Sequence, residues 1–161
     1  MISKIKKKVP ATAAIQVWNR QRNIRIDSGA VKIFCAALAE SLNFSDQAFS
    51  VIFTGTAAMH RLNYEWRKKD CATDVLSFAY DNEFIDGLPF LGEIVIAPEI
   101  AARWAAEYGM TTEREIRKLI VHGALHLMGY DHETDCGEMI KIQNRLMRRR
   151  FFISGPEFIR G

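Results

Sequence analysis

The stretch TEREIRKLIVHGALHLMGYDH, residues 112–132, decides what kind of fold the chain can form. Thr112 followed three residues later by Glu115 predicts a capping box at the start of a helix. Apolar residues then recur at helical spacing and form one stripe: Ile116, Leu119, Ile120 and Gly123. A helix with one apolar stripe must pack against another layer of structure, which the rest of the chain has to supply.

Four segments rich in apolar and β-branched residues are predicted as strands: 14–19, 48–53, 74–80 and 91–97. Further helices are predicted with Ser28 and Thr56 as N-caps and with Pro98 in the first turn, and a last helix is predicted to run from about Thr134 to Arg150. Because only a loop joins the third and fourth strands, we expect them to pair antiparallel. The sequence therefore predicts a single α+β domain over residues 1–161, with a mixed sheet of about four strands covered by helices.

The composition is that of an ordinary globular domain, with 161 residues of which 48% are hydrophobic and 25% charged. This apolar content argues against disorder, and no apolar run approaches the ~18 residues of a membrane span. The N-terminus lacks the apolar stretch of a secretory signal. Three widely spaced cysteines do not form a disulfide framework. Free thiols suit a reducing compartment, so a cytoplasmic location is expected.

The net charge of +3 says little by itself, but the basic residues gather in two clusters. The clusters are Lys4, Lys6, Lys7 and Lys8 near the start, and Arg145, Arg148, Arg149 and Arg150 near the end. Such clusters can attract nucleic acid. The alternative interpretation is a solvated tail and a solvated helix face.

Three of the four histidines fall within residues 122–132. His122 and His126 are four residues apart, so both rings project from one face of a helix. Gly129 allows the helix to end in a left-handed turn that brings His132 back toward them. Three imidazoles and a water are the pattern of an open catalytic metal site. We expect one Zn²⁺ there, although other divalent transition metals also suit nitrogen ligands, and a packed, hydrogen-bonded histidine cluster is the alternative.

The spacing H-x3-H-x2-G-x2-H matches the zinc-binding helix of metzincin proteases. Such a protease carries a glutamate base directly after its first histidine. Gly123 occupies that position here and cannot take a proton, which argues against peptide hydrolysis by the usual route. A bound metal would still activate a water molecule.

The segment HGALHLMGYDH at 122–132 resembles the signature of the YbeY family of bacterial metallo-endoribonucleases. Supporting segments are LNYEWRKKD at 62–70, TDVLSF at 73–78 and LGEIVI at 91–96, and the resemblance covers about residues 10–150. It leaves out the basic tail at 1–9. The resemblance implies a zinc-dependent, single-strand-specific RNase in ribosomal RNA maturation, especially at the small-subunit 3′ end, and in ribosome quality control. Its implied partners are ribosomal RNA and ribosomal subunits or assembly factors, with no DNA and no membrane.

The resemblance also implies roles for four residues. His122, His126 and His132 correspond to the metal ligands, and Arg67 to the family's active-site arginine. A guanidinium beside a metal can clamp phosphate oxygens and stabilise charge that develops on phosphorus. The leading hypothesis is that a metal-bound water attacks the phosphodiester, with the general base unassigned.

Several neighbouring residues carry two interpretations each. Asp131 either orients a ligand imidazole or caps the turn after Gly129. Substrate contact or an ordinary structural or solvated role is open for Thr73, Asp74, Ser77, Lys68 and Lys69. Cys136 is more easily read as a free cysteine than as a further ligand, because three histidines and water complete the coordination.

Three further side chains are expected to be structural. His60, alone on the helix after Thr56, is one of them. Trp66 and Trp104 lie on apolar helix faces and are expected in the core.

Two other functions compete with an RNase. A zinc peptidase or other metallohydrolase would need its base from elsewhere, for example Glu93 or Glu138. A non-catalytic ribosome assembly factor would use the metal only for structure, which the pattern of three histidines and water argues against.

Overall fold

The structure is a computed structural model that describes residues 14–161, so the basic tail predicted at 1–9 lies outside the described residues. The elements are β1 (Ile15–Asn19), α1 (Ser28–Ser41), β2 (Ala48–Phe53), α2 (Thr56–Arg67), β3 (Val75–Ala79), β4 (Phe84–Ile85), β5 (Leu88–Ile96), α3 (Pro98–Glu107), α4 (Thr112–Leu127), α5 (Glu138–Met147) and α6 (Arg150–Ser154). No helix in this part of the chain has the length and apolar character needed to cross a bilayer.

The sheet is mixed, as predicted, and follows the order β1-β2-β5-β3. β2 pairs parallel with both β1 and β5, whereas β3 pairs antiparallel with β5. Within the described residues the sheet has five strands, because β4 forms a short hairpin with the start of β5. Asp86 and Gly87 at the hairpin turn both have positive φ, 50° and 78°, the geometry that favours a tight two-residue turn.

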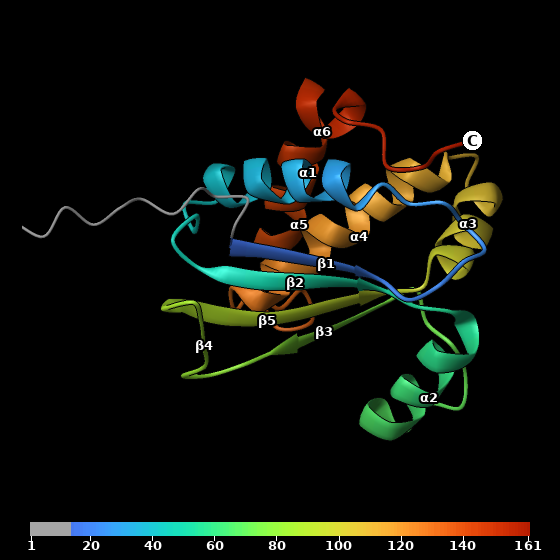
Figure 1. The fold of residues 1–161 in the computed structure, drawn as a ribbon, viewed down its shortest axis with the longest axis horizontal. Helices are drawn as coiled ribbons and strands as arrows, with labels where there is room; N and C mark the ends of the chain where they lie inside the picture. The colour runs from blue at the N-terminus through green and yellow to red at the C-terminus, as the bar shows by residue number, and fades with distance from the viewer. Residues whose placement is uncertain (1–13) are drawn as a thin grey trace, which may run out of the picture.

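The main core lies on one side of the sheet. Phe49, Val51 and Phe53 of β2 point to this side and pack with buried residues of α1, α4, α5 and α6. Figure 1 shows these helices together on that side, with α2 apart from them. A smaller cluster on the opposite side joins Ile52 and Val95 to residues of α2 and α3. Within residues 14–161 the sheet is therefore covered fully on one face and in part on the other.

Helix α4 lies unusually close to the sheet because of Gly123. A Cβ built at Gly123 would lie 2.6 Å from Cγ2 of Ile94 on β5 and 3.0 Å from its Cγ1. Both atoms belong to a β-branched side chain that has little freedom to turn away. The glycine thus allows close packing of helix on sheet, and the position leaves no room for the glutamate of a metzincin.

Gly123→Ala is expected to destabilise the fold, by roughly 1–3 kcal/mol for an overpacked core. Helix propensity alone predicts the opposite sign, a gain of about 1 kcal/mol when alanine replaces glycine in a helix. The sign of the change in the free energy of unfolding, measured by denaturant titration, separates the two. A more stable variant would show that α4 does not need this close contact.

Several predicted N-cap residues are wrong by one position, because the helices begin at the residues that were expected to precede them. The side chain of Asp27, not Ser28, caps α1 by accepting from the amides of Gly29 and Ala30. Likewise Thr111 caps α4, so the capping box predicted at Thr112 does not form, and α2 is preceded by Gly55 with no side-chain cap. At α1 and α4 the side-chain oxygen of the residue directly before the helix accepts from the free amides, and at α2 that residue is a glycine with no such acceptor.

The last predicted helix is also shorter than expected. Residues 134–137 form turns, because Asp135 accepts from the amides of Gly137 (2.7 Å) and Met139 (2.9 Å) and so caps a helix that begins at Glu138. Two tryptophans expected in the core are exposed, Trp66 by 63% and Trp104 by 42%. Helical periodicity marks an apolar face but cannot say whether another layer covers it.

Candidate metal centre

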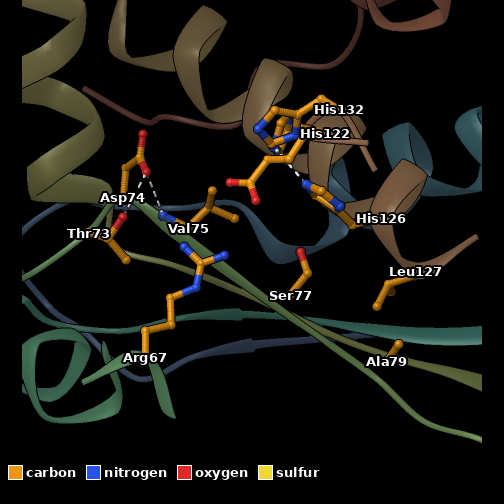
Figure 2. Close-up of a pocket in the computed structure, with 11 residues that line it drawn as sticks. Arg67, Thr73, Asp74, Val75, Ser77, Ala79, His122, His126, Leu127 and His132 are labelled. Atoms are coloured by element: carbon orange, nitrogen blue, oxygen red, sulfur yellow. Dashed lines mark hydrogen bonds between the residues drawn. The ribbon is translucent and has the colours of Figure 1, made fainter. Parts of the chain in front are cut away.

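The three histidines of residues 122–132 meet at one point. His122 and His126 project from α4, and His132 comes from the loop that follows it (Figure 2). One nitrogen of each ring lies within 4.8 Å of the other two. The ring centroids are 4.7–5.2 Å apart. The three rings could therefore share one metal ion.

The turn after α4 brings the third ring into place. Gly129 has φ of 94°, the left-handed conformation that the sequence predicted. Its amide donates to the carbonyl of His126 (2.9 Å), and the next amide, of Tyr130, donates to that of Leu125 (3.1 Å). These bonds close the helix and reverse the chain, which is why His132 faces the helix it has just left.

The outer nitrogens of two rings are held by acceptors. Nδ1 of His126 lies 3.0 Å from the backbone carbonyl of Tyr130, and Nδ1 of His122 lies 3.0 Å from Oε1 of Gln143. Because a carbonyl oxygen can only accept, each Nδ1 carries the proton and donates it. Each Nε2 is then left with a bare lone pair that points to the common centre.

The two bare nitrogens test whether a metal fits. Nε2 of His122 and Nε2 of His126 are 3.1 Å apart, and neither has a proton to give the other. Two lone pairs this close repel unless a cation lies between them. A tetrahedral ion with metal–nitrogen bonds of about 2.0–2.1 Å would hold its ligands roughly 3.3 Å apart, so the observed spacing fits a metal of this kind.

Electrostatics also favour neutral imidazoles here. Burial lowers the pKa of His122 and of His126 below the ordinary histidine value. Proximity to His132 lowers both further, and the positive charge of Arg67 adds to the effect on His126. Neutral imidazole is the form that binds metal.

A hollow of about 360 Å³ opens beside the histidines. Arg67, at the end of α2, lines it with residues of β3 and the preceding turn, among them Thr73, Asp74 and Ser77. Figure 2 shows Arg67 across the hollow from the histidines, with its guanidinium directed toward the space between Asp74 and Ser77. Oδ1 of Asp74 accepts from the amide of Val75 (2.8 Å) and from the hydroxyl of Thr73 (3.3 Å), which fixes this carboxylate at the start of β3.

Arg67 has no acidic partner within the described residues, where the ion pairs shorter than 4.0 Å involve other side chains. Its guanidinium is therefore available to an anion that enters the hollow. Arg67 and His126 line the same hollow, so both side chains can contact one ligand there. Carboxylates and phosphates are the anions that pair with this fork of donors in two places at once.

The structure separates the alternatives for neighbouring residues. Asp131 caps the turn, since it accepts from the amide of Glu133 (3.0 Å) and the hydroxyl of Thr134 (3.1 Å). Lys68 lies at the C-cap of α2 and donates to the carbonyl of Glu65 (2.9 Å). Cys136 is exposed and outside the histidine group. His60 pairs with Asp70 on the surface.

Two residues near the histidines were missed from the sequence. Glu133 lines the hollow directly after His132, a position that adjacency alone could have suggested. Gln143 is buried on α5, 21 residues from the ring it contacts, and no spacing rule connects the two. The bases considered for a peptidase, Glu93 and Glu138, are not among the residues that line this hollow.

Gln143→Leu is expected to weaken zinc binding about 10- to 100-fold, the usual effect of removing a partner that orients a metal-binding histidine. Leucine keeps the packing volume but offers no acceptor to Nδ1 of His122. Gln143→Glu keeps an acceptor and is expected to restore most of the affinity. Competition with a chromogenic chelator measures each constant, and Asn144→Ala, at the exposed neighbouring position, is the control. Unchanged affinity in Gln143→Leu would contradict the orienting role.

Comparison with known proteins relates this site to a described family. A family model described as "Endoribonuclease YbeY" matches residues 16–150. A protein of that name from Thermodesulfovibrio yellowstonii is 37% identical over 144 residues, which cover 81% of this chain and 91% of that protein. Another from Solibacter usitatus is 46% identical over 97 residues, 60% of this chain and 62% of that protein. The solution structure of TM1509 from Thermotoga maritima aligns with a TM-score of 0.57 at 29% identity, over 81% of this chain and 85% of that one.

Proposed function

This chain belongs to the YbeY family of endoribonucleases, and from that premise we propose that it hydrolyses single-stranded RNA with a zinc ion held by His122, His126 and His132. One observation carries the proposal. Nε2 of His122 and Nε2 of His126 lie 3.1 Å apart, while both rings are fixed by acceptors at Nδ1. The donor set is that of an open zinc site, with three imidazoles and a position left for water or substrate.

Different residues of the chain bind the ion and the substrate. When bound, zinc supplies a Lewis acid and lowers the pKa of a coordinated water toward neutrality. Gln143 and the carbonyl of Tyr130 keep the imidazoles of His122 and His126 in the tautomer that binds metal. Arg67 binds the phosphate oxygens from the opposite wall and stabilises the negative charge that grows during cleavage.

A peptidase is the weaker candidate for this site. Gly123 cannot act as a base, and any side chain at that position would collide with Ile94. Glu93 cannot substitute for it, because its neighbour Ile94 points into the helical core and successive strand residues point to opposite faces. A free guanidinium opposite the histidines suits a phosphodiester, which is anionic, better than a neutral peptide bond.

The biological substrate that we propose is ribosomal RNA, with the small-subunit 3′ end as the region processed. Family membership supports a role in processing ribosomal RNA. Exposed arginines at 145 and 148–150, on and after α5, would add attraction to a polyanion such as a ribosomal subunit.

Strand preference tests this proposal directly. Zinc-loaded protein is incubated with a labelled RNA, either alone or annealed to its complement, in the presence and absence of a chelator. We expect cleavage of the single strand, a rate on the duplex at least about tenfold lower, and no cleavage after chelation until zinc is added back. Equal cleavage of both forms, or cleavage that survives chelation, would contradict the proposal.

A further inference from the structure

The second face of the sheet carries a groove that the proposed reaction does not use. Alternate residues of the strands point to this face, among them Ile52 of β2, Phe78 of β3 and Val95 of β5. Among the described residues, α2 and the start of α3 are the elements that cover it, toward one end of the strands (Figure 1). Beyond α2 the face is hollowed into a groove of about 270 Å³. That volume lies just below the roughly 300–1,000 Å³ of sites for drug-sized molecules, so it suits a smaller flat ligand.

Aromatic rings form the wall of the groove. Trp66 lies against Phe78 with ring centroids 5.5 Å apart, and Tyr80, directly after β3, lines the same groove. The side chain of Trp66 is 63% exposed and that of Tyr80 43%. Large rings are normally buried, and their exposure around one hollow marks a binding surface.

Polar groups at the base and rim define what the groove can recognise. Glu93 lies half-buried beside Phe78, its partner on the neighbouring strand, and accepts from the hydroxyl of Tyr80 at 3.3 Å. Burial and the charge of Glu93 raise the pKa of Tyr80, so its hydroxyl stays protonated and donates. The carboxylate keeps lone pairs for a second donor. Arg20 lies exposed at the rim, outside the ion pairs of the described residues.

The groove and the metal-site hollow lie on opposite faces of one strand, β3. Trp66 and Arg67 are consecutive residues, yet the first lines the groove and the second lines the hollow. In the same way Phe78 faces the groove, while Ser77 and Ala79 face the hollow. β3 is the edge strand of the sheet, so an extended chain that crosses it would contact both sites.

We propose that this groove is a subsite for one unpaired nucleobase of the RNA, stacked on Trp66 with its amino edge turned to Glu93. An aromatic wall, an acceptor and a nearby cation are the means by which proteins hold single-stranded RNA. Guanine fits best, because its N1–H and N2–H donors are adjacent and can meet both oxygens of one carboxylate. Uracil has a single N–H and fits least. The inference rests on the proposed function, because the base in the groove would belong to the same RNA that is cleaved at the histidines.

Nucleosides provide the test, because they have no phosphate that could bind at Arg67 or the metal. They also have no phosphodiester bond that the protein could cleave. Guanosine and uridine are titrated into the full-length, zinc-loaded protein, and dissociation constants are taken from chemical shifts in NMR spectra. We expect guanosine to bind at least about fivefold more tightly than uridine. Trp66→Ala should weaken guanosine binding about fivefold or more, through loss of stacking. Glu93→Gln should remove most of the preference for guanosine.

Trp104→Ala is the matched control, because Trp104 is 42% exposed on α3 and stacks on Tyr108 away from the groove. Its constants should equal those of the unmodified protein. The proposal is overturned if no nucleoside binds, or if Trp66→Ala and Glu93→Gln behave as Trp104→Ala does. In that case the exposed rings would instead suit an apolar segment of a protein.

Cleavage of RNA by the same proteins keeps this inference separate from the proposed function. Nucleoside binding with the expected variant effects supports the subsite even if no RNA is cut, and only the function would then fail. Cleavage of RNA without nucleoside binding overturns the subsite and leaves the function standing.

Discussion

Replacing His126 with alanine is expected to abolish zinc binding and to lower RNA cleavage by more than about a thousandfold. Nε2 of His126 lies 3.1 Å from Nε2 of His122. Without His126, two imidazoles remain to hold the ion. Zinc content by elemental analysis and single-turnover cleavage of a labelled RNA are measured on the same preparation. Circular dichroism and thermal unfolding establish that the variant is folded.

His60→Ala is the control, because His60 is the fourth histidine and pairs with Asp70 on the surface of α2. It should bind zinc and cleave RNA as the unmodified protein does. If His126→Ala lost zinc but kept its cleavage rate, the three histidines would hold a structural ion and the reaction would take place elsewhere.

The second large effect is expected at Arg67. Arg67→Ala should lower the cleavage rate by about 100- to 1,000-fold, the effect of removing one donor that stabilises a developing charge. Zinc binding should be unchanged, because Arg67 belongs to the opposite wall of the hollow and not to the histidine group. Arg67→Lys keeps the charge but not the two-pronged geometry, so an intermediate rate is expected.

Arg61→Ala is the matched control on the same helix. Arg61 is exposed and lines a different hollow, beside His60 and Tyr64. Loss of zinc together with activity in Arg67→Ala would mean that the arginine supports the site rather than the substrate. A full cleavage rate in Arg67→Ala would remove it from the mechanism.

The histidine cluster could be predicted from sequence because its geometry is local. A spacing of four residues fixes the direction of two rings on any helix, and a glycine in the left-handed conformation brings the third ring back. The mixed sheet was predictable for a similar reason, since a short loop between two strands favours antiparallel pairing.

Residues that reach the site through tertiary packing could not be found in this way. Arg67 lies at the end of a helix on the other side of the edge strand, yet it lines the same hollow as the histidines. Its place near them was expected only from the family resemblance. The comparisons confirm that resemblance. Gln143 contacts its histidine through the packing of α5 against α4, which no local pattern encodes. The exposure of Trp66 depends on how far α2 covers the sheet, again a property of the whole fold.

Titration of zinc into metal-free protein tests the central claim most directly. The protein is kept at a concentration well above its dissociation constant for zinc. Zinc is then added in steps, and RNA cleavage is followed under single-turnover conditions. We expect the rate to rise from zero in proportion to added zinc and to level off at one ion per chain, with no rise in His126→Ala. Full cleavage before any zinc is added, or an equal response from His126→Ala, would contradict a zinc RNase built on these three histidines.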